Sequence, residues 1–570
     1  MADGLRSVDE LNFVPERSLF PSPLDWRDQF IYFLLVDRFD NNAPDLKPFQ
    51  SVHEADAHDP TRRHLFQGGN LKGIIRRLDY IRGLGCTTIW LSPILKNRVD
   101  QPGSYHGYGI QDFLQVDPRF GTLEDLQQLT AAAHARDIYV ILDVVLNHTG
   151  DVWAYPDDRP YYYYRDRSFP FGFWREVDPR SGLQEDDAVW PRELQRPDVF
   201  RRKGQIRNWH ESVEAQNGDF LSLKELDLRQ AEVLDTLIRV YKHWIAVADP
   251  DGFRIDTVKH MEDSATAVFC NAIREYATRV GKHNFFLFGE IVADDQTIQR
   301  YIGRNSPVEG TSERFPSLDA ALDFPLYFML EEVIKGFYSP ALLRRRYEGF
   351  RNNYSDHGAA GRYFVTFVDN HDQMSRPYRR FMHGNPFTEQ VVLAMAWLLT
   401  SQGVPCIYYG TEQGFDGGGP DDSYVRECMF GGDWGAFQTS GRHFFNPSNP
   451  IYQDISIIAG LRSSYPVLRY GRLYFREISA DGSNFGFPLD RRGTLAYSRI
   501  LDTEEMLVLL NLDTAPRSDH ITVDRNLSPP GSTMVNMLDT DQRITVGDSY
   551  GRAYVRVTVP AHGCAILKLQ

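Results

Sequence analysis

The chain has 570 residues and a net charge of −15, with 42% hydrophobic, 13% aromatic and 24% charged residues. This composition is that of a folded globular protein and excludes a mainly disordered chain. The negative charge argues against nucleic acid as a partner, because nucleic-acid-binding proteins carry a basic face. The longest apolar stretch, near Val391–Thr400, is far shorter than the ~20 residues that cross a bilayer, so we expect no membrane partner.

The N-terminus, MADGLRSVDELNF, lacks a basic region followed by an apolar core, so no secretory signal is visible. The cysteines are odd in number and show no metal-binding spacing; they are Cys86, Cys270, Cys406, Cys428 and Cys564. Cys86, Cys406 and Cys564 lie in apolar surroundings, which predicts buried thiols. Together these features favour a cytoplasmic protein, although a mature secreted fragment would look the same.

Eight short apolar runs alternate with amphipathic stretches between about Gln29 and Gly410. The runs cover residues 31–36, 88–92, 138–145, 252–256, 285–289, 317–323, 363–368 and 406–410. Their β-branched and aromatic residues are typical of strands buried on both faces. Between them, Gln230–Ala248 has helical apolar spacing. The alternation predicts an α/β fold, a (β/α)8 TIM barrel over residues 28–148 and 229–465, preceded by an N-terminal extension, residues 1–27, without a readable role.

Two segments depart from this alternation. More than 100 residues separate the third and fourth runs, and their first part, from Thr149 to about Leu226, is rich in Pro, Gly, Asp and aromatic residues. A connection of this length predicts a small inserted domain, residues 149–228. After about Leu468 the pattern is purely β, and Val555, Val557 and Val559 would share one face of a strand. We therefore predict a C-terminal antiparallel β-sandwich domain over residues 466–570.

The inserted segment is rich in aromatic residues, namely Trp153, Tyr155, Tyr161, Tyr162, Tyr163, Tyr164, Phe169, Phe171, Phe173 and Trp174. Aromatic faces can stack against the apolar faces of sugar rings. A small domain also needs aromatic residues for its own core. The sequence leaves both interpretations open.

Polar residues gather where the predicted strands end, and these ends meet at one mouth of a barrel. They are Asp143, Asn147, His148, Arg254, Asp256, Glu290, Asp369, His371 and Asp372. Paired carboxylates at one mouth suit glycoside hydrolysis, in which one carboxylate is ionised and another holds a proton. Arg254 lies two residues before Asp256, so both side chains point to the same side of the strand. We expect the guanidinium to lower the pKa of Asp256 and to keep it ionised.

Four stretches in the same order and spacing resemble the signature regions of the α-amylase family of glycoside hydrolases (family 13). They are DVVLNH (143–148), DGFRIDTVKH (251–260), FGE (288–290) and FVDNHD (367–372). YHGYGIQDF (105–113) and KELDLRQ (224–230) resemble two further family segments. The similarity runs from about Phe30 to Tyr409, and the motifs are closest to those of α-amylases, maltogenic amylases and cyclodextrin glucanotransferases.

The resemblance implies a role for each matching residue. Asp256 would be the nucleophile, Glu290 the general acid/base, and Asp372 the third carboxylate, which grips the sugar. Arg254 would orient Asp256. The remaining sugar-binding residues would be His106, Tyr108, Asp143, His148, Lys259, His260 and His371, with Tyr108 stacked under the sugar and Lys259 and His260 on the leaving-group side. The family mechanism would then retain the α configuration through a covalent glycosyl-enzyme.

The resemblance also implies a structural calcium ion, and no organic cofactor. In the family a shared site lies between the barrel and the inserted domain, and its ligands would here be Asn147, Asp227 and the backbone carbonyl of His260. The KELDL segment around Asp227 lacks the usual proline of the family. A second candidate is the loop DRFDNNAPD (37–45), with Asp40, Asn42 and Asp45, which is similar to a calcium loop of cyclodextrin-forming relatives. Acidic Asn/Asp loops are also common turns.

The TVKH ending of the second region resembles enzymes that act on α-1,4-glucans. We therefore expect a retaining hydrolase of α-1,4-glucosidic bonds in maltooligosaccharides or starch. The alternative is a 4-α-glucanotransferase that uses the same residues and passes the glycosyl group to a second sugar instead of water. A sugar-binding protein without catalysis, or a barrel enzyme with an open catalytic metal, would require a different set of residues. The sequence does not indicate an oligomeric state.

Overall fold

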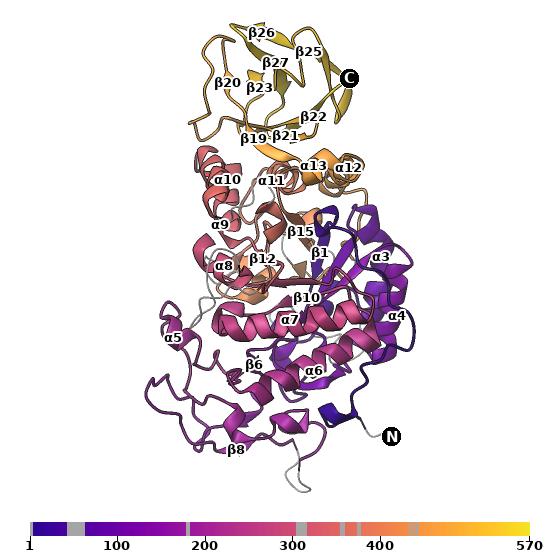
Figure 1. Ribbon diagram of the computed structural model, residues 1–570, viewed down its shortest axis with the longest axis vertical. Helices are drawn as coiled ribbons and strands as arrows, with labels where there is room; N and C mark the ends of the chain where they lie inside the picture. Colours follow the sequence, from indigo (N-terminus) through magenta and orange to yellow (C-terminus); the bar gives the residue numbers. More distant parts are fainter. Residues whose placement is uncertain are drawn as a thin grey trace.

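A closed barrel of eight parallel strands lies at the centre of the computed structural model (Figure 1). Around the barrel the strand order is β1–β15–β13–β12–β11–β10–β5–β2. The strands are β1 (Ile31–Leu34), β2 (Thr88–Leu91), β5 (Tyr139–Val144), β10 (Gly252–Ile255), β11 (Phe286–Gly289), β12 (Ala320–Leu322), β13 (Phe364–Thr366) and β15 (Val404–Tyr408). Each overlaps one of the eight apolar runs, so the predicted TIM barrel is confirmed.

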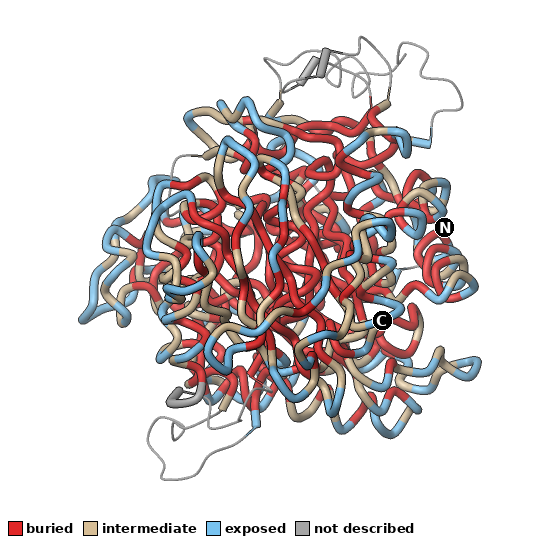
Figure 2. Tube along the Cα trace, turned by 90° about the horizontal axis from the view of Figure 1, so that it is seen from above, coloured by how far each residue is buried: buried red, intermediate tan, exposed pale blue. Residues whose placement is uncertain are grey.

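The structure describes residues 4–42, 63–177, 183–303, 316–353, 360–372, 378–430, 433–434, 437–438 and 443–570. Within these residues, helices surround the barrel, and Figure 2 shows the buried residues concentrated inside this ring. The helices are α1 (Val36–Phe39), α3 (Leu71–Gly83), α4 (Leu123–His134), α6 (Ala231–Ala248), α7 (Asp263–Arg279), α8 (Asp295–Ile302), α9 (Phe324–Ile334), α10 (Ala341–Asn353), α11 (Glu389–Thr400), α12 (Pro450–Ser464) and α13 (Pro466–Tyr470). The predicted helix over 230–248 corresponds to α6, which buries its apolar face against the barrel.

The segment before β1 packs along the barrel. Trp26 stacks on Phe286 of β11, with ring centroids 4.6 Å apart, and its indole N–H donates to the Asn284 carbonyl at 2.8 Å. Further back, the Phe20 N–H donates to the Asp249 carboxylate at 3.0 Å. The segment thus covers the end of the barrel at which the strands begin, whereas the sequence indicated no role for it.

Short strands organise the segment between β5 and α6. In the part that follows β5, β6 (His148–Thr149) pairs with β9 (Lys224–Glu225), and β7 (Trp153–Ala154) pairs with β8 (Phe173–Trp174). The same segment contains the helix α5 (Ser212–Ala215). Elsewhere in the chain, the remaining strands are β3 (Leu95–Asn97), β4 (Ile110–Val116), β14 (Tyr378–Arg379), β16 (Gly418–Gly419), β17 (Asp433–Trp434) and β18 (Phe437–Gln438). In Figure 1 the segment with β8 and α5 lies at the opposite end of the molecule from the C-terminal sheets.

Some aromatic residues of this inserted segment form its core, and others are exposed and available for stacking on a sugar. Trp153 and Tyr155 are buried, and their rings lie 4.7 Å apart in a cluster with Tyr161, Phe169 and Phe171. These residues form the core of the segment. Three others are exposed on the surface, namely Tyr162, Tyr164 and Phe173.

Two antiparallel sheets form the C-terminal region, as predicted. One has the order β19–β21–β22–β28–β24–β25 and the other β20–β23–β27–β26. The strands are β19 (Arg472–Phe475), β20 (Ile478–Ser479), β21 (Thr494–Leu501), β22 (Glu504–Asn511), β23 (Arg517–Thr522), β24 (Thr533–Asn536), β25 (Asp539–Thr545), β26 (Gly547–Ser549), β27 (Arg552–Val559) and β28 (Cys564–Leu569). Val555, Val557 and Val559 of β27 are all buried, so the predicted shared face is confirmed.

A buried arginine joins these sheets to the barrel region. Arg499 of β21 is fully buried, and its guanidinium donates to the carbonyls of Ser401 at 2.6 Å and Leu468 at 2.7 Å. It also donates to the carbonyls of Thr400 and Gly471. Because these carbonyls belong to the ends of α11 and α13, one side chain connects three elements.

All five cysteines are free thiols, and all lie in described parts of the chain. Cys86 and Cys406 are buried as predicted, whereas Cys564 is partly exposed. Among the described residues, no helix combines the length and apolarity needed to cross a membrane.

Candidate active site

One guanidinium connects three carboxylates at the ends of the barrel strands. Arg254 of β10 is fully buried, and its Nη1 donates to Asp143 at 2.8 Å and to Asp256 at 2.7 Å. Its Nη2 donates to Glu290 Oε2 at 2.7 Å. The parallel pairing of β5, β10 and β11 places these residues side by side, because Arg254 is in register with Asp143 and Phe288. The predicted proximity of Asp256 and Glu290 is thus present.

The turn after β10 shapes this arrangement. Thr257 adopts the left-handed backbone conformation, with φ 45°, which is unusual for a β-branched residue. In this turn the Thr257 N–H donates to Glu290 Oε2 at 3.1 Å. Glu290 therefore receives two donors on one oxygen, which fixes its orientation beside Asp256. Backbone strain at such a position is typical of a functional site.

Asp143 lies on the inner side of the site. Its Oδ2 accepts the Tyr108 hydroxyl at 2.8 Å and the Trp90 indole N–H at 3.1 Å, and its Oδ1 accepts Arg254. Burial raises the pKa of Asp143 to about 6, although Arg254 opposes this change. Asp143 thus holds Tyr108 and Arg254 in position.

Arg254 is one of several groups that change the pKa of Asp256. Burial raises the pKa of Asp256 well above its usual value, and the negative charges of Glu290 and Asp143 act in the same direction. Arg254 lowers this pKa, but it is shared among three carboxylates. The expectation that Arg254 lowers the pKa of Asp256 is correct in direction, but the net pKa is raised, because desolvation and the neighbouring carboxylates outweigh one shared positive charge.

Asp372 lies opposite, after β13. Its backbone N–H donates to Asn370 Oδ1 at 2.8 Å. Burial and the charge of Glu290 raise the pKa of Asp372 to about 7, and Arg426 opposes them. Arg426 is buried and donates to the His371 carbonyl at 2.9 Å, so it positions the turn that carries Asp372.

His148 and His371 are buried at this mouth, and His106 is partly buried. Burial lowers the pKa of His106 and of His148 to about 3, and it lowers that of His371 well below its usual value. Tyr108 and His371 stack with ring centroids 5.3 Å apart. Neither ring nitrogen of His148, nor Nδ1 of His371, has a hydrogen-bond partner among the described residues. Buried polar atoms without partners are costly, so these nitrogens are suited to a polar ligand.

The side of the site near the inserted segment is aromatic. His260 Nδ1 lies 2.7 Å from the Ala215 carbonyl, and its ring contacts Phe220 and Trp209. Phe220 also faces His148, with ring centroids 6.1 Å apart. Lys259 Nζ lies 3.4 Å from the Val292 carbonyl. The structure therefore places His260 beside Phe220, which also faces His148, and Lys259 at the Val292 carbonyl.

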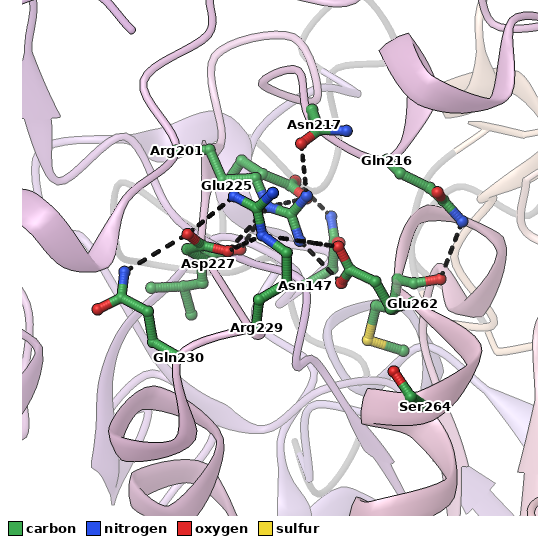
Figure 3. Close-up of polar contacts among 12 residues, drawn as sticks. Asn147, Arg201, Gln216, Asn217, Glu225, Asp227, Arg229, Gln230, Glu262 and Ser264 are labelled. Atoms are coloured by element: carbon green, nitrogen blue, oxygen red, sulfur yellow. Dashed lines mark hydrogen bonds and ion pairs between the residues drawn. The ribbon is translucent and has the colours of Figure 1, made fainter. Parts of the chain in front are cut away.

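Two of the three predicted shared calcium ligands, Asn147 and Asp227, have side-chain partners (Figure 3). Asn147 Nδ2 donates to Glu225 Oε2 at 2.6 Å, and Asp227 accepts from Arg229 at 2.7 Å. The buried guanidinium of Arg201 lies among them, 3.7 Å from Asp227 Oδ1. Among the described residues, no group of three His, Cys, Asp or Glu side chains is suited to hold a metal ion. The predicted set of Asn147, Asp227 and His260 therefore does not fit a calcium ion, because a positive side chain lies among its donors.

The second predicted calcium loop shows no ligand cluster in its described part. Asp40 is buried and its Oδ2 accepts Arg77 Nε at 2.5 Å. Its Oδ1 accepts the backbone N–H of Asn42 at 2.6 Å, as in an Asx turn. Asp45 lies outside the described residues. Asp40 and Asn42 thus form the common turn that was the alternative interpretation.

Three residues at these sites were not predicted from the sequence, namely Trp90, Arg201 and Arg426. Trp90 belongs to a predicted strand, and only the position of its ring beside Asp143 distinguishes it from a core residue. Arg201 and Arg426 lie in irregular stretches in which arginine is common. The pattern of the chain carries no signal for their place in the site, because Glu262 and His371, which they bind there, are distant in sequence.

Comparison with known proteins places this geometry among related chains. A family model described as the alpha amylase catalytic domain matches residues 33–429. An α-amylase of Streptomyces lividans is 31% identical over 563 residues, covering 90% of this chain, which spans 57% of that relative. The crystal structure of an α-amylase from Geobacillus thermoleovorans, complexed with acarbose, is 28% identical with a TM-score of 0.70, and covers 96% of this chain and 99% of its own. CldA, a cyclomaltodextrin glucanotransferase with three domains, is 26% identical with a TM-score of 0.70, covering 95% and 99%.

Proposed function

Because the chain belongs to the α-amylase family, we propose that it is a retaining glycoside hydrolase that cleaves α-1,4-glucosidic bonds of maltooligosaccharides or starch. The observation that carries this proposal is the cluster in which Arg254 binds Asp256 and Glu290 through adjacent nitrogens. Two carboxylates held close together on one guanidinium suit a mechanism through a covalent glycosyl-enzyme. The Geobacillus relative is an α-amylase whose structure holds acarbose, which supports an α-glucan as the ligand of this chain.

In the first step, Asp256 attacks the anomeric carbon while the bond from that carbon to the leaving oxygen breaks. Glu290 gives its proton to the leaving oxygen. This step requires Asp256 to be ionised and Glu290 to be protonated. Arg254 contacts both carboxylates, so one positive charge lies beside the group that attacks and the group that gives the proton.

In the second step, a water molecule attacks the same carbon and Glu290 takes its proton. The bond to Asp256 breaks, and the sugar leaves with its original configuration. His148 and His371 would donate hydrogen bonds to sugar hydroxyls, since their buried ring nitrogens lack partners among the described residues. Tyr108 would stack under the sugar, held by its hydroxyl on Asp143, and Asp372 would be the third carboxylate that grips the sugar.

A second candidate is a 4-α-glucanotransferase reaction with the same residues, in which a sugar hydroxyl replaces water. The likeness to CldA supports keeping this candidate. Phe220 and Trp209, which lie at His260 on the leaving-group side, are aromatic surfaces against which an acceptor sugar can stack. The two reactions differ in the final acceptor and not in the catalytic residues.

The first experiment is a time course with maltoheptaose, followed by chromatography and an assay of reducing ends. Shorter products with rising reducing ends support hydrolysis. Longer or cyclic products with few new reducing ends support the transferase. The absence of turnover on maltoheptaose and on starch would contradict both candidates.

Asp256→Asn tests the assignment of the nucleophile. We expect turnover to fall by at least about 10⁴-fold, because the covalent step is lost while the fold remains. The matched control is Asp198→Asn, whose side chain is 67% exposed, and it should keep full activity. Substantial activity of Asp256→Asn would overturn the assignment.

A further inference from the structure

We propose that Arg201 holds the inserted segment on the barrel in the place predicted for calcium, so that the fold of this protein does not require a calcium ion. Arg201 belongs to the inserted segment, between Phe200 and β9. Its guanidinium lies among Asp227, Glu225 and Glu262, next to Asn147 (Figure 3). The inference concerns the cohesion of the fold and is independent of which reaction the barrel catalyses.

The contacts of Arg201 span the junction. From its buried position, Nη2 donates to both oxygens of Glu262, at 2.7 and 2.8 Å, and Nη1 donates to Asn217 Oδ1 at 2.7 Å. Nε donates to the Leu226 carbonyl at 3.3 Å. Glu262 immediately precedes α7 of the barrel, whereas Asn217 and Leu226 belong to the inserted segment. One side chain therefore ties the two parts together with charge-assisted hydrogen bonds.

The same place does not offer the donors that calcium requires. Calcium binds six to eight oxygens at about 2.3–2.6 Å. Here Glu262 is occupied by Arg201, and Asp227 accepts Nε and Nη2 of Arg229 at 2.7 and 2.9 Å. Asn147 donates its amide N–H to Glu225 at 2.6 Å. A divalent ion at this position would also lie against a guanidinium and be repelled by it.

The junction adjoins the predicted sugar site. The Leu226 N–H donates to the Asn147 carbonyl at 2.9 Å, and β6 pairs His148 with Glu225. The Arg201 N–H in turn donates to the Glu225 carbonyl at 3.1 Å. Arg201 therefore supports the strand pair that carries His148, and it acts on the site as a positioning residue without touching the reacting groups.

The test uses the melting temperature of the full chain. Wild type is measured in buffer alone, with EDTA, and with millimolar CaCl2. We expect the three melting temperatures to agree within about 1 °C, since no bound ion stabilises the folded state. A decrease with EDTA, or an increase with calcium, would overturn the proposal.

Arg201→Met provides the second arm, with Arg229→Met as its matched control. Arg229 binds the same Asp227 but is 54% exposed. We expect Arg201→Met to lower the melting temperature by about 3 °C or more, because removing one partner of a buried ion pair leaves carboxylates unpaired. Arg229→Met should change it by less than about 1 °C. Equal effects of the two substitutions would overturn the proposal.

Hydrogen exchange localises the effect and covers the case in which Arg201→Met does not fold. In Arg201→Lys the positive charge remains, but the fork that binds Glu262 and Asn217 together is lost. We expect faster amide exchange in residues 199–227 and unchanged exchange in the C-terminal sheets. Unchanged exchange in residues 199–227 would overturn the proposal.

Discussion

At the scale of single residues, the distribution of charge around Arg254 sets the chemistry. Asp143, Asp256 and Glu290 share one guanidinium, and Asp372 lies close enough for its pKa to respond to Glu290. Burial weakens the solvation of every charge in this cluster. Burial therefore raises the pKa values of Asp143, Asp256 and Asp372, and Arg254 opposes the increase at each of them.

Arg254→Lys tests whether this sharing matters. A lysine keeps the positive charge but cannot donate from two rigid nitrogens to Asp256 and Glu290 at once. We expect kcat/KM to fall by at least about 100-fold, since small displacements of catalytic groups have effects of this size. Steady-state kinetics on maltooligosaccharides measures the effect, and circular dichroism checks the fold. A loss of less than tenfold would contradict the role of the shared guanidinium.

Asp372→Asn is expected to change stability in a pH-dependent manner. The pKa of Asp372 is about 7 in the folded state and about 3.9 in an unfolded chain. The stability from this group is therefore present below pH ~4 and is lost as pH rises through ~7. Asn does not titrate. The difference in unfolding free energy between the variant and wild type should therefore shift by about 1 to 2 kcal/mol in favour of the variant when the pH is raised from 5 to 8. Urea unfolding at both pH values measures this, and an equal difference at both would contradict the raised pKa.

The residues of the site were predictable to different degrees. Asp256, Glu290 and Asp372 follow buried strands, and strand ends in a barrel converge, so their proximity follows from the sequence pattern. The raised pKa of Asp256 did not follow, because it depends on the burial of the whole cluster. Arg201 was not predictable either, since its partner Glu262 lies on another part of the fold.

At the scale of elements, the segment before β1 covers the end of the barrel at which the strands begin and stabilises it. Trp26→Ala should destabilise the protein by about 3 kcal/mol, because it removes a ring stacked on Phe286 and leaves a cavity. The catalytic parameters should not change, since the site lies at the other end of the strands. Leu24→Ala is the matched control, because Leu24 is fully exposed. Urea unfolding measures the free energy of unfolding of both variants, and equal values would contradict a stabilising role of the segment before β1.

The barrel strands were predictable because each carries an uninterrupted apolar run, which is the pattern of strands covered on both faces. The helix α6 was predictable from its spacing for the same kind of reason. The inserted segment was predicted from the length of the connection and from its Pro, Gly, Asp and aromatic content. Its two-residue strands, β6 and β9 among them, are too short for a period to be visible in the sequence.

At the scale of the whole molecule, Arg499 binds the C-terminal sheets to the ends of α11 and α13. Arg499→Met removes the donor of the Ser401 and Gly471 carbonyls, so we expect a loss of about 3 kcal/mol or more. Differential scanning calorimetry measures the shift and shows whether the sheets then melt separately. Arg472→Met, at an exposed position of β19, should stay within about 0.5 kcal/mol of wild type. A wild-type melting profile for Arg499→Met would contradict this attachment.

The buried guanidinium of Arg201 also bears on where such a protein can work. An ion taken up from solution is lost on dilution or in the presence of citrate, phosphate or other chelating anions, because its occupancy follows mass action. A cation carried by the polypeptide is supplied with every newly made chain and cannot diffuse away. The position of the Arg201 guanidinium is fixed by folding itself. The calcium concentration of the surroundings therefore does not affect the shape of the barrel mouth that we propose binds sugar.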